Sequence, residues 1–194
     1  MILTRRAALG TLAAVAMAPV PAFALSTGDA QTLVAGLVRE VNAVIASGKP
    51  EAAMLRDFES IFDRYADVPT IARYALGADA RRASPDQLRR FTAAYKTYVA
   101  HKYGRRFREF IGSEIVPGDA RPVKSWIEVN TSVDLRGREK FYVDFHVSDK
   151  AGRPLFFNLI IEGVNMLLAE RTEIGAILDS KGGNIDALIA EISR

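Results

Sequence analysis

Apolar residues recur every three or four positions through the part of the chain that follows the N-terminal segment. This spacing is typical of amphipathic helices. It predicts helices over about residues 33–45, 54–62 and 71–76. Gly48 follows the first of these runs and Gly77 follows the third, and glycine is a common signal for the end of a helix.

The clearest helix start in the chain is Ser84. Serine there can cap the free amide of the third helical residue, Pro85 fits the first turn, and Gln87 can reach back to the amide of the cap. The apolar pattern predicts that this helix continues to about Ile111, with Gly104 as a place to bend or end. Its buried side is expected to be rich in aromatic rings, with Leu88, Phe91, Tyr95, Tyr98, Val99, Tyr103, Phe107 and Phe110.

The second half of the chain alternates apolar and polar residues, which predicts strands over about residues 127–135, 141–147 and 155–161. Short turns join these strands, so neighbours must run antiparallel. Helices are expected over about residues 165–178 and 185–192. Because no linker separates the two halves, we predict a single α+β domain in which helices wrap a curved antiparallel sheet.

The third predicted strand carries large apolar residues at both odd and even positions. Strict alternation places Phe157 on the same face as Leu159 and Ile161, and Phe156 on the opposite face. We therefore expect both faces of this strand to be covered by other parts of the protein.

The first 24 residues have the features of a cleaved export signal rather than of the folded domain. Arg5 and Arg6 form the basic start, and an uncharged apolar stretch too short to span a bilayer follows. Ala22 and Ala24 occupy the two positions that a signal peptidase recognises. Cleavage after Ala24 would leave residues 25–194 as the mature domain. The paired arginines also resemble a twin-arginine export motif.

Composition narrows the possible chemistry. The chain has 194 residues, 49% of them hydrophobic, with no cysteine and two histidines. Disulfides, thiolate metal sites and a cysteine nucleophile are therefore excluded, and no metal site is expected. The full chain has 26 basic and 23 acidic residues, and removal of the two signal arginines leaves a net charge of about +1. Nucleic acid is therefore not an expected partner.

Catalytic motifs are scarce. The sequence lacks a nucleophile elbow, a phosphate-binding glycine loop and a zinc-binding helix motif. Asp144 and His146 lie two residues apart on one strand face, where they would form an acid–base pair if they pointed inward, or decorate the solvent face if they did not. The second arrangement is the expected one, so no catalytic residue is assigned and the protein is not expected to be an enzyme.

A set of short motifs, individually weak, resembles the MlaC family, also called toluene-tolerance auxiliary proteins. These motifs occur in the order typical of that family and span nearly the whole predicted mature chain. They are Phe62-Asp63, Ala72-Arg73, Leu76-Gly77, Arg82-Ala83-Ser84, Phe91, Tyr95, Tyr103, Ile161-Glu162-Gly163-Val164 and Arg171.

The resemblance implies a periplasmic phospholipid-binding carrier with no cofactor besides its bound lipid. Such a carrier shuttles lipid between an outer-membrane lipoprotein complex and an inner-membrane ABC transporter with an MCE-domain subunit, and so maintains outer-membrane lipid asymmetry. A hopanoid-associated carrier of the same family remains an alternative, as does an envelope adaptor or an enzyme that uses a cone-shaped α+β fold without lipid. Ala80, Asn158, Asn165 and Glu170 depart from the residues usual in the family.

A carrier of this kind needs a cavity with large apolar side chains and no buried charge. The candidates from helices are the aromatic residues of the capped helix and their neighbours, and the candidates from strands are the inward-facing positions. Together the expected lipid-binding residues are Tyr74, Phe91, Tyr95, Tyr98, Val99, Tyr103, Phe107, Val129, Val133, Phe145, Phe157, Leu159, Ile161, Met166 and Leu167.

Overall fold

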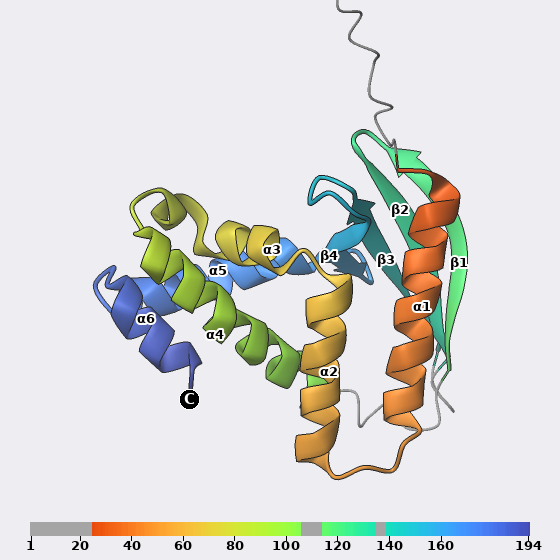
Figure 1. Cartoon of the computed structure of the whole chain (residues 1–194), viewed down its shortest axis with the longest axis horizontal. Helices are drawn as coiled ribbons and strands as arrows, with labels where there is room; N and C mark the ends of the chain where they lie inside the picture. Colours follow the sequence, from red (N-terminus) through yellow and green to blue (C-terminus); the bar gives the residue numbers. More distant parts are fainter. Residues whose placement is uncertain (1–24, 106–113, 135–138) are drawn as a thin grey trace, which may run out of the picture.

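The computed structural model describes residues 25–105, 114–134 and 139–194, and it forms one α+β domain (Figure 1). Among these residues, no helix combines the length and the apolar character needed to cross a membrane. The helices and strands in chain order are α1 (Thr27–Ile45), α2 (Glu51–Tyr65), α3 (Val68–Leu76), η1 (Gly77–Arg81), α4 (Pro85–Gly104), β1 (Glu114–Val123), β2 (Trp126–Asp134), β3 (Phe141–Ser148), β4 (Leu155–Ile161), β5 (Val164–Asn165), α5 (Met166–Ser180) and α6 (Ile185–Ile192).

Local sequence signals explain where helix α4 starts and where it ends. Ser84 accepts a hydrogen bond from the Gln87 amide, and the Gln87 side chain accepts one from the Ser84 amide, so the predicted capping box at α4 is confirmed. The helix ends at Gly104, where an added Cβ would lie 2.7 Å from Leu55 Cδ2, which shows how closely α4 approaches α2. Of the expected continuation to Ile111, residues 106–111 lie outside the described part.

Within the described residues, the sheet contains five antiparallel strands in the order β1-β2-β3-β4-β5. The three predicted strands are confirmed as β2, β3 and β4, whereas β1 was not expected. Pro117 and Pro122 interrupt its sequence, and most of its side chains are exposed, so it carries no apolar alternation. Proline is tolerated because β1 lies at the sheet edge and its register shifts between Pro117 and Ala120.

A second irregularity changes which residues of β4 face inward. Val147 pairs with Phe156 while His146 pairs with Asn158, so Phe157 is an extra residue in β4. The Phe156 ring packs at 5.6 Å from the Phe145 ring, on the face that Phe145 shares with its partner Leu159. The expectation that Phe157 shares this face was therefore wrong, and Phe156 occupies it instead.

The turn between β4 and β5 consists of Glu162 and Gly163, with φ angles of 48° and 77°. Two successive positive φ values define the tight turn that suits the twist of a hairpin. The Glu162 carboxylate accepts a hydrogen bond from the Tyr142 amide at 2.5 Å, which ties the turn to β3. This turn directs the chain into α5 beside the sheet.

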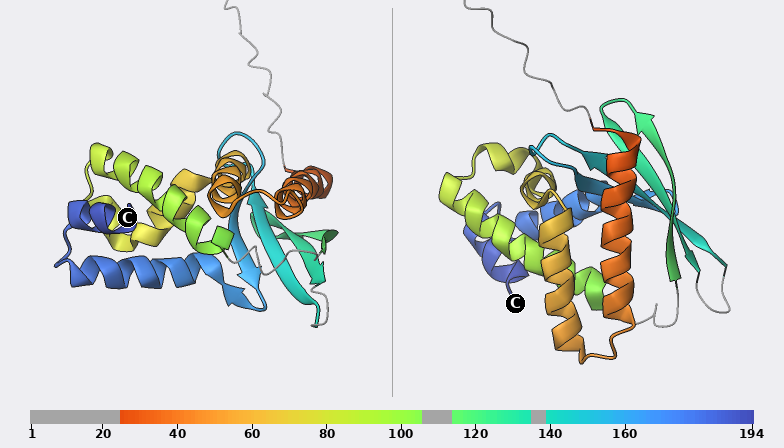
Figure 2. Two further views of the ribbon diagram at one scale, coloured as in Figure 1. Left: turned by 90° about the horizontal axis from the view of Figure 1, so that it is seen from below. Right: turned by 45° about the vertical axis from the view of Figure 1, so that its right-hand side comes forward.

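The inner face of the sheet carries alternate residues of β2 and β3, among them Val129, Val133 and Phe145. Helix α1 packs on this face along β1 and β2, and α2 runs back beside α1 (Figure 1). Helices α3 to α6 form a second helical group next to β4, and α4 packs this group against α2 (Figure 2). The Asp67 amide, at the junction of α2 and α3, donates to the Phe156 carbonyl at 2.8 Å and so fixes this group to the sheet.

We expect the Ser84→Ala variant to lose about 1 kcal/mol of unfolding free energy, because the Gln87 amide loses its acceptor. Urea denaturation measures this loss. Ser180→Ala is the matched control, since Ser180 is exposed and donates only to a carbonyl in the last turn of α5. A loss equal to that of the control would show that the capping box does not stabilise α4.

Candidate functional site

An apolar cavity of about 500 Å³ lies against the inner face of the sheet. The hydroxyls of Thr131 and Tyr103 are used within the protein, because the first donates to the Val143 carbonyl at 2.9 Å and the second to Glu170. The wall therefore offers almost only carbon to a ligand. It consists of Tyr103, Ile115, Thr131, Val133, Phe141, Val143, Phe145, Leu159, Ile161, Val164 and Met166.

Two smaller spaces lie beside this cavity, and Tyr103 and Leu159 border all three. One, of about 130 Å³, lies between α1, α2 and α4 and is bordered by Phe58 and Phe62. The other, of about 70 Å³, lies between β4, α4 and α5 and is bordered by Tyr95. The three spaces therefore lie next to one another between the sheet and the helices.

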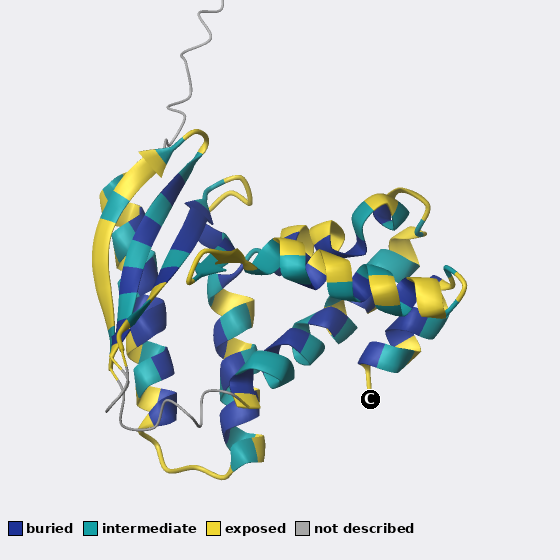
Figure 3. Ribbon diagram, turned by 180° about the vertical axis from the view of Figure 1, so that it is seen from behind, coloured by how far each residue is buried: buried dark blue, intermediate teal, exposed yellow. Residues whose placement is uncertain are grey.

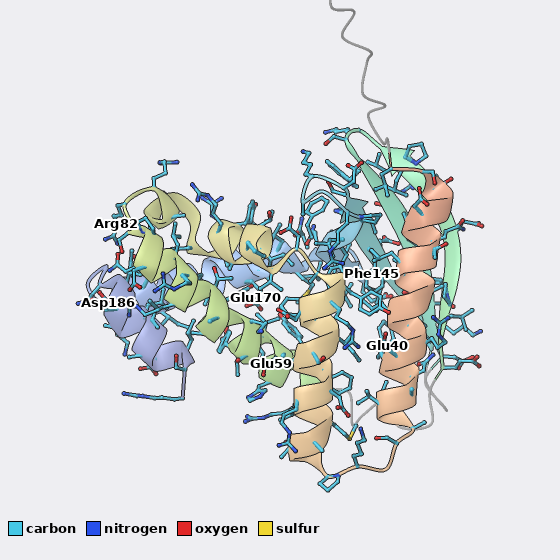
Figure 4. All side chains as sticks on the ribbon, in the orientation of Figure 1. Glu40, Glu59, Arg82, Phe145, Glu170 and Asp186 are labelled. Atoms are coloured by element: carbon cyan, nitrogen blue, oxygen red, sulfur yellow. The ribbon has the colours of Figure 1, made fainter. Side chains whose placement is uncertain are left out.

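Ten of the predicted ligand-binding residues border these spaces. One of them, Phe145, is labelled in Figure 4, on the inner face of the sheet. The ring of Phe157 contacts Trp126 and His146, yet the residue still borders the smallest space. The ten are Tyr95, Val99, Tyr103, Val133, Phe145, Phe157, Leu159, Ile161, Met166 and Leu167.

Four other predicted residues do not border the cavity. Phe91 is fully buried and stacks on Tyr95 with ring centroids 5.6 Å apart, and Val129 is likewise fully buried in the core. The Tyr98 hydroxyl is hydrogen-bonded to Glu173. Tyr74 is exposed at the surface. Helical and strand spacing placed Phe91 and Val129 on buried faces but did not separate core contacts from cavity contacts, and it placed the exposed Tyr74 wrongly. Phe107 lies outside the described residues.

Several cavity residues were missed by the sequence analysis. Phe141 and Val143 alternate with Phe145 along the predicted strand, so their pattern was available. Ile115 could not be found, because it belongs to the edge strand that shows no alternation. Phe156 faces inward only because β4 contains an extra residue. Other missed residues come from helices whose direction only the fold determines, among them Leu37, Val41, Phe58, Ile61, Phe62 and Ile71.

Glu170 is a buried acidic residue at the wall of the smallest space, which corrects the expectation of a cavity without buried charge. It is 4% exposed and lies between α5 and α4 (Figure 4). Its Oε1 atom accepts hydrogen bonds from the Tyr103 hydroxyl and from Lys102 Nζ at 2.7 Å. Lys102 also donates to Glu173 at 2.5 Å. A half-buried ion-pair network therefore closes this side of the interior.

The pKa values in this network follow from burial and charge. Desolvation, together with the hydrogen bond to Glu170, raises the pKa of Tyr103, and desolvation also raises that of Tyr95. Desolvation alone would lower the pKa of Lys102, but hydrogen bonds to Glu170 and Glu173 outweigh it and raise the pKa above its ordinary value. Both tyrosines are therefore neutral hydroxyl groups and Lys102 is a cation at neutral pH.

Asp144 and His146 do not form an acid–base pair. The Asp144 carboxylate accepts a hydrogen bond from the Asn130 amide at 2.6 Å. His146 Nε2 lies 3.3 Å from Glu128 Oε2, and Nδ1 lies 3.3 Å from the Asn158 amide nitrogen. His146 is only 9% exposed, so the expectation of a solvent-facing position was wrong. Its position next to Phe145 in β3 places it on the face opposite the cavity.

Two positions that depart from the family pattern organise the start of α5. Asn165 caps this helix by accepting a hydrogen bond from the Leu168 amide at 3.1 Å. Asn158 accepts hydrogen bonds from the amides of Leu159 and Leu167 at 2.9 and 3.0 Å. Arg171, a motif residue, stacks over the exposed Tyr74 ring at 5.4 Å rather than facing the cavity.

Two basic residues of α4 form ion pairs with acidic side chains, both within α4 and in other helices. Arg90 bonds to Asp86 and Asp186 at 2.6 Å each, and Lys96 bonds to Asp63 at 3.2 Å. The described residues also contain no group of three or more histidine, aspartate or glutamate side chains placed to hold a metal ion.

Comparison with known proteins gives two results. Residues 35–194 match the family model described as MlaC protein. The fold is similar to the solved structure of a phospholipid-binding protein from Ralstonia solanacearum in complex with a phospholipid, with a TM-score of 0.70 and 20% sequence identity. That similarity covers 84% of this chain and 94% of the Ralstonia chain.

We expect Lys102→Met to destabilise the protein by about 3 kcal/mol, because it leaves the buried Glu170 carboxylate without its cation. Adding Glu170→Leu should recover part of this loss, because it removes the unpaired buried charge while the Tyr103 hydroxyl loses its acceptor. Urea denaturation of both variants measures the difference. A double variant no more stable than Lys102→Met would contradict this account of the network.

Proposed function

The chain belongs to the MlaC family, and we propose that it is a carrier that encloses the apolar chains of a phospholipid between its sheet and its helices. The observation that carries this proposal is the apolar cavity of about 500 Å³ against the inner face of the sheet. Its size lies within the range of roughly 300–1,000 Å³ that is usual for sites that bury small molecules.

The physical task of a lipid carrier explains why such an interior is needed. Each methylene exposed to water costs about 0.8 kcal/mol, so a two-chain lipid with about 30 methylenes would face about 24 kcal/mol. A carrier lowers this cost by offering carbon contacts in place of the bilayer. Val133 and Phe145 supply such contacts, and they carry no group that would have to lose its hydration.

The rim of the cavity suits entry of a chain from outside. Val164, on the short strand β5, is 55% exposed, whereas Val133 is 2% exposed, although both border the same space. A continuous apolar path therefore leads from the surface to the interior. The fold similarity to the Ralstonia protein, which was solved with a phospholipid, supports the same conclusion.

We further propose that the protein works in the periplasm, where it exchanges lipid with an outer-membrane lipoprotein complex and an inner-membrane MCE-domain ABC transporter and so helps to maintain outer-membrane lipid asymmetry. The basic and apolar character of residues 1–24 supports export, and membership of the MlaC family supports the transport role. These partners need no catalysis by the carrier.

We expect native mass spectrometry of the protein, purified without detergent after export, to show adducts with the mass of a phospholipid. Organic extraction and lipid analysis would identify the head group and the number of chains. Protein that carries no lipid and takes none up from phosphatidylethanolamine–phosphatidylglycerol vesicles would contradict the proposal.

We expect Val133→Trp to reduce lipid uptake from the same vesicles by about tenfold or more, which corresponds to a loss of ~1.4 kcal/mol or more of binding free energy. The indole would occupy the space that Val133 borders. Uptake is measured by extraction and quantification of lipid phosphorus.

The matched control is Ser132→Trp, which adds a tryptophan at the next position of β2, on the opposite face of the sheet. Normal uptake by the control and reduced uptake by Val133→Trp would support the cavity as the lipid site. Equal uptake by a folded Val133→Trp variant would show that lipid binds elsewhere.

A further inference from the structure

Asn158 connects the cavity wall to a histidine on the other face of the sheet. Its Oδ1 atom accepts hydrogen bonds from the backbone amides of Leu159 and Leu167, at 2.9 and 3.0 Å. Leu159 borders all three cavity spaces, and Leu167 lies in the first turn of α5, where it borders the smallest space. One buried side chain therefore joins strand β4 to the start of the helix beside the cavity.

The two amides fix the orientation of the Asn158 side chain. Two N–H groups point at one of its terminal atoms, so that atom must be the oxygen and the other must be the nitrogen. The nitrogen, Nδ2, lies 3.3 Å from Nδ1 of His146. Because Nδ2 carries only donor hydrogens, Nδ1 must be without a proton and act as the acceptor.

The same contacts decide where the ring proton of His146 lies. A neutral imidazole with an unprotonated Nδ1 carries its proton on Nε2, and Nε2 lies 3.3 Å from the Glu128 carboxylate. A second proton can enter only at Nδ1, where it faces the amide hydrogens of Asn158. Protonation of the ring therefore keeps the contact with Glu128 and breaks the contact with Asn158.

The charged groups near His146 have partners of their own. Glu128, which faces it from β2, accepts hydrogen bonds from Arg121 of β1 at 2.8 and 2.5 Å. Asp144, on the same face of β3, accepts one from Asn130 at 2.6 Å. Within the described part of the chain, the polar atom at hydrogen-bond distance from Nδ1 is the Asn158 nitrogen. The other neighbours are two aromatic rings with centroids 5.3 and 5.9 Å away, Trp126 and Phe157.

We propose that Asn158 is a positioning residue for the lipid cavity and that it acts while His146 is neutral. In this state it holds the Leu167 amide and with it the first turn of α5, whose Met166 borders the large cavity. Histidine is the side chain whose charge normally changes between pH 5 and 8. Mild acid therefore weakens the attachment of α5 to β4 and speeds the release of bound lipid. This inference rests on the proposed lipid-carrier function and adds a condition for release.

The test measures how fast the protein, loaded with nitrobenzoxadiazole-labelled phosphatidylethanolamine, releases this lipid to unlabelled phosphatidylethanolamine–phosphatidylglycerol vesicles. Rates at pH 5.5 and pH 7.0 are compared, because ordinary carboxylates stay ionised over this interval. We expect release to be about fivefold faster at pH 5.5, the effect of losing about 1 kcal/mol of hydrogen bonding.

His146→Gln tests the role of the ring, because glutamine can accept from Asn158 but gains no proton in this interval, so the ratio of the two rates should fall close to one. Asn158→Asp keeps an acceptor for the Leu159 and Leu167 amides and can also accept from a protonated Nδ1, so acid should no longer speed release. His101→Gln removes the other histidine of the chain and is the matched control, in which the fivefold ratio should persist.

A ratio near one in the unchanged protein would overturn the inference, and so would a fivefold ratio that survives in a folded His146→Gln variant. Circular dichroism at both pH values establishes that each variant is folded, and Asn158→Asp gives an independent test should His146→Gln fail to fold. Loss of the ratio in His101→Gln would assign the pH dependence to the wrong histidine and contradict the proposal. Protein that takes up no labelled lipid at either pH would instead reject the carrier function itself.

Discussion

Incomplete cover of an apolar sheet face is the constraint on which the interior of this protein depends. The inner face must be shielded from water, yet α1 packs mainly along β1 and β2. Helices α3 and α5 contact β4, which lies toward the opposite end of the strand order. Val143 and Phe145 of β3 therefore face the space between these supports instead of a packed helix. The hydrogen bond from the Asp67 amide to the Phe156 carbonyl anchors the α2–α3 junction to β4 and so fixes the position of the helical group beside the sheet.

Much of the fold could be predicted from the sequence, because its helices and central strands have strong local signals. The capping box at Ser84 and the alternation in β2 are examples of local patterns that each predict a single structure. Strand β1 could not be predicted, since an edge strand with Pro117 and Pro122 needs neither alternation nor a full ladder of amide donors. The inward position of Phe156 was equally inaccessible, because the extra residue in β4 arises from pairing with β3. Figure 3 shows the resulting contrast between the exposed edge and the buried centre of the sheet.

The cavity was predictable in character but not in its details. Tyr103 and Leu159 lie on predicted buried faces and border the cavity, and Val99 borders the two smaller spaces beside it. Phe91 has the same sequence character but contributes to the core, since the direction of a helix decides which buried residue meets a space. Glu170 was expected to matter only as a departure from a family pattern. Its role as a buried ion-pair partner became visible only when α4 placed Lys102 and Tyr103 beside it.

The two edges of the sheet have a consequence for how the protein behaves at high concentration. An open sheet edge can pair with the edge of another molecule and start aggregation. Here the β1 edge contains two prolines, a register shift and the exposed Arg121, while the other edge ends in the two-residue strand β5. Each of these features opposes strand addition. Among the described residues, neither edge of the sheet therefore offers a long, regular template for intermolecular β-pairing.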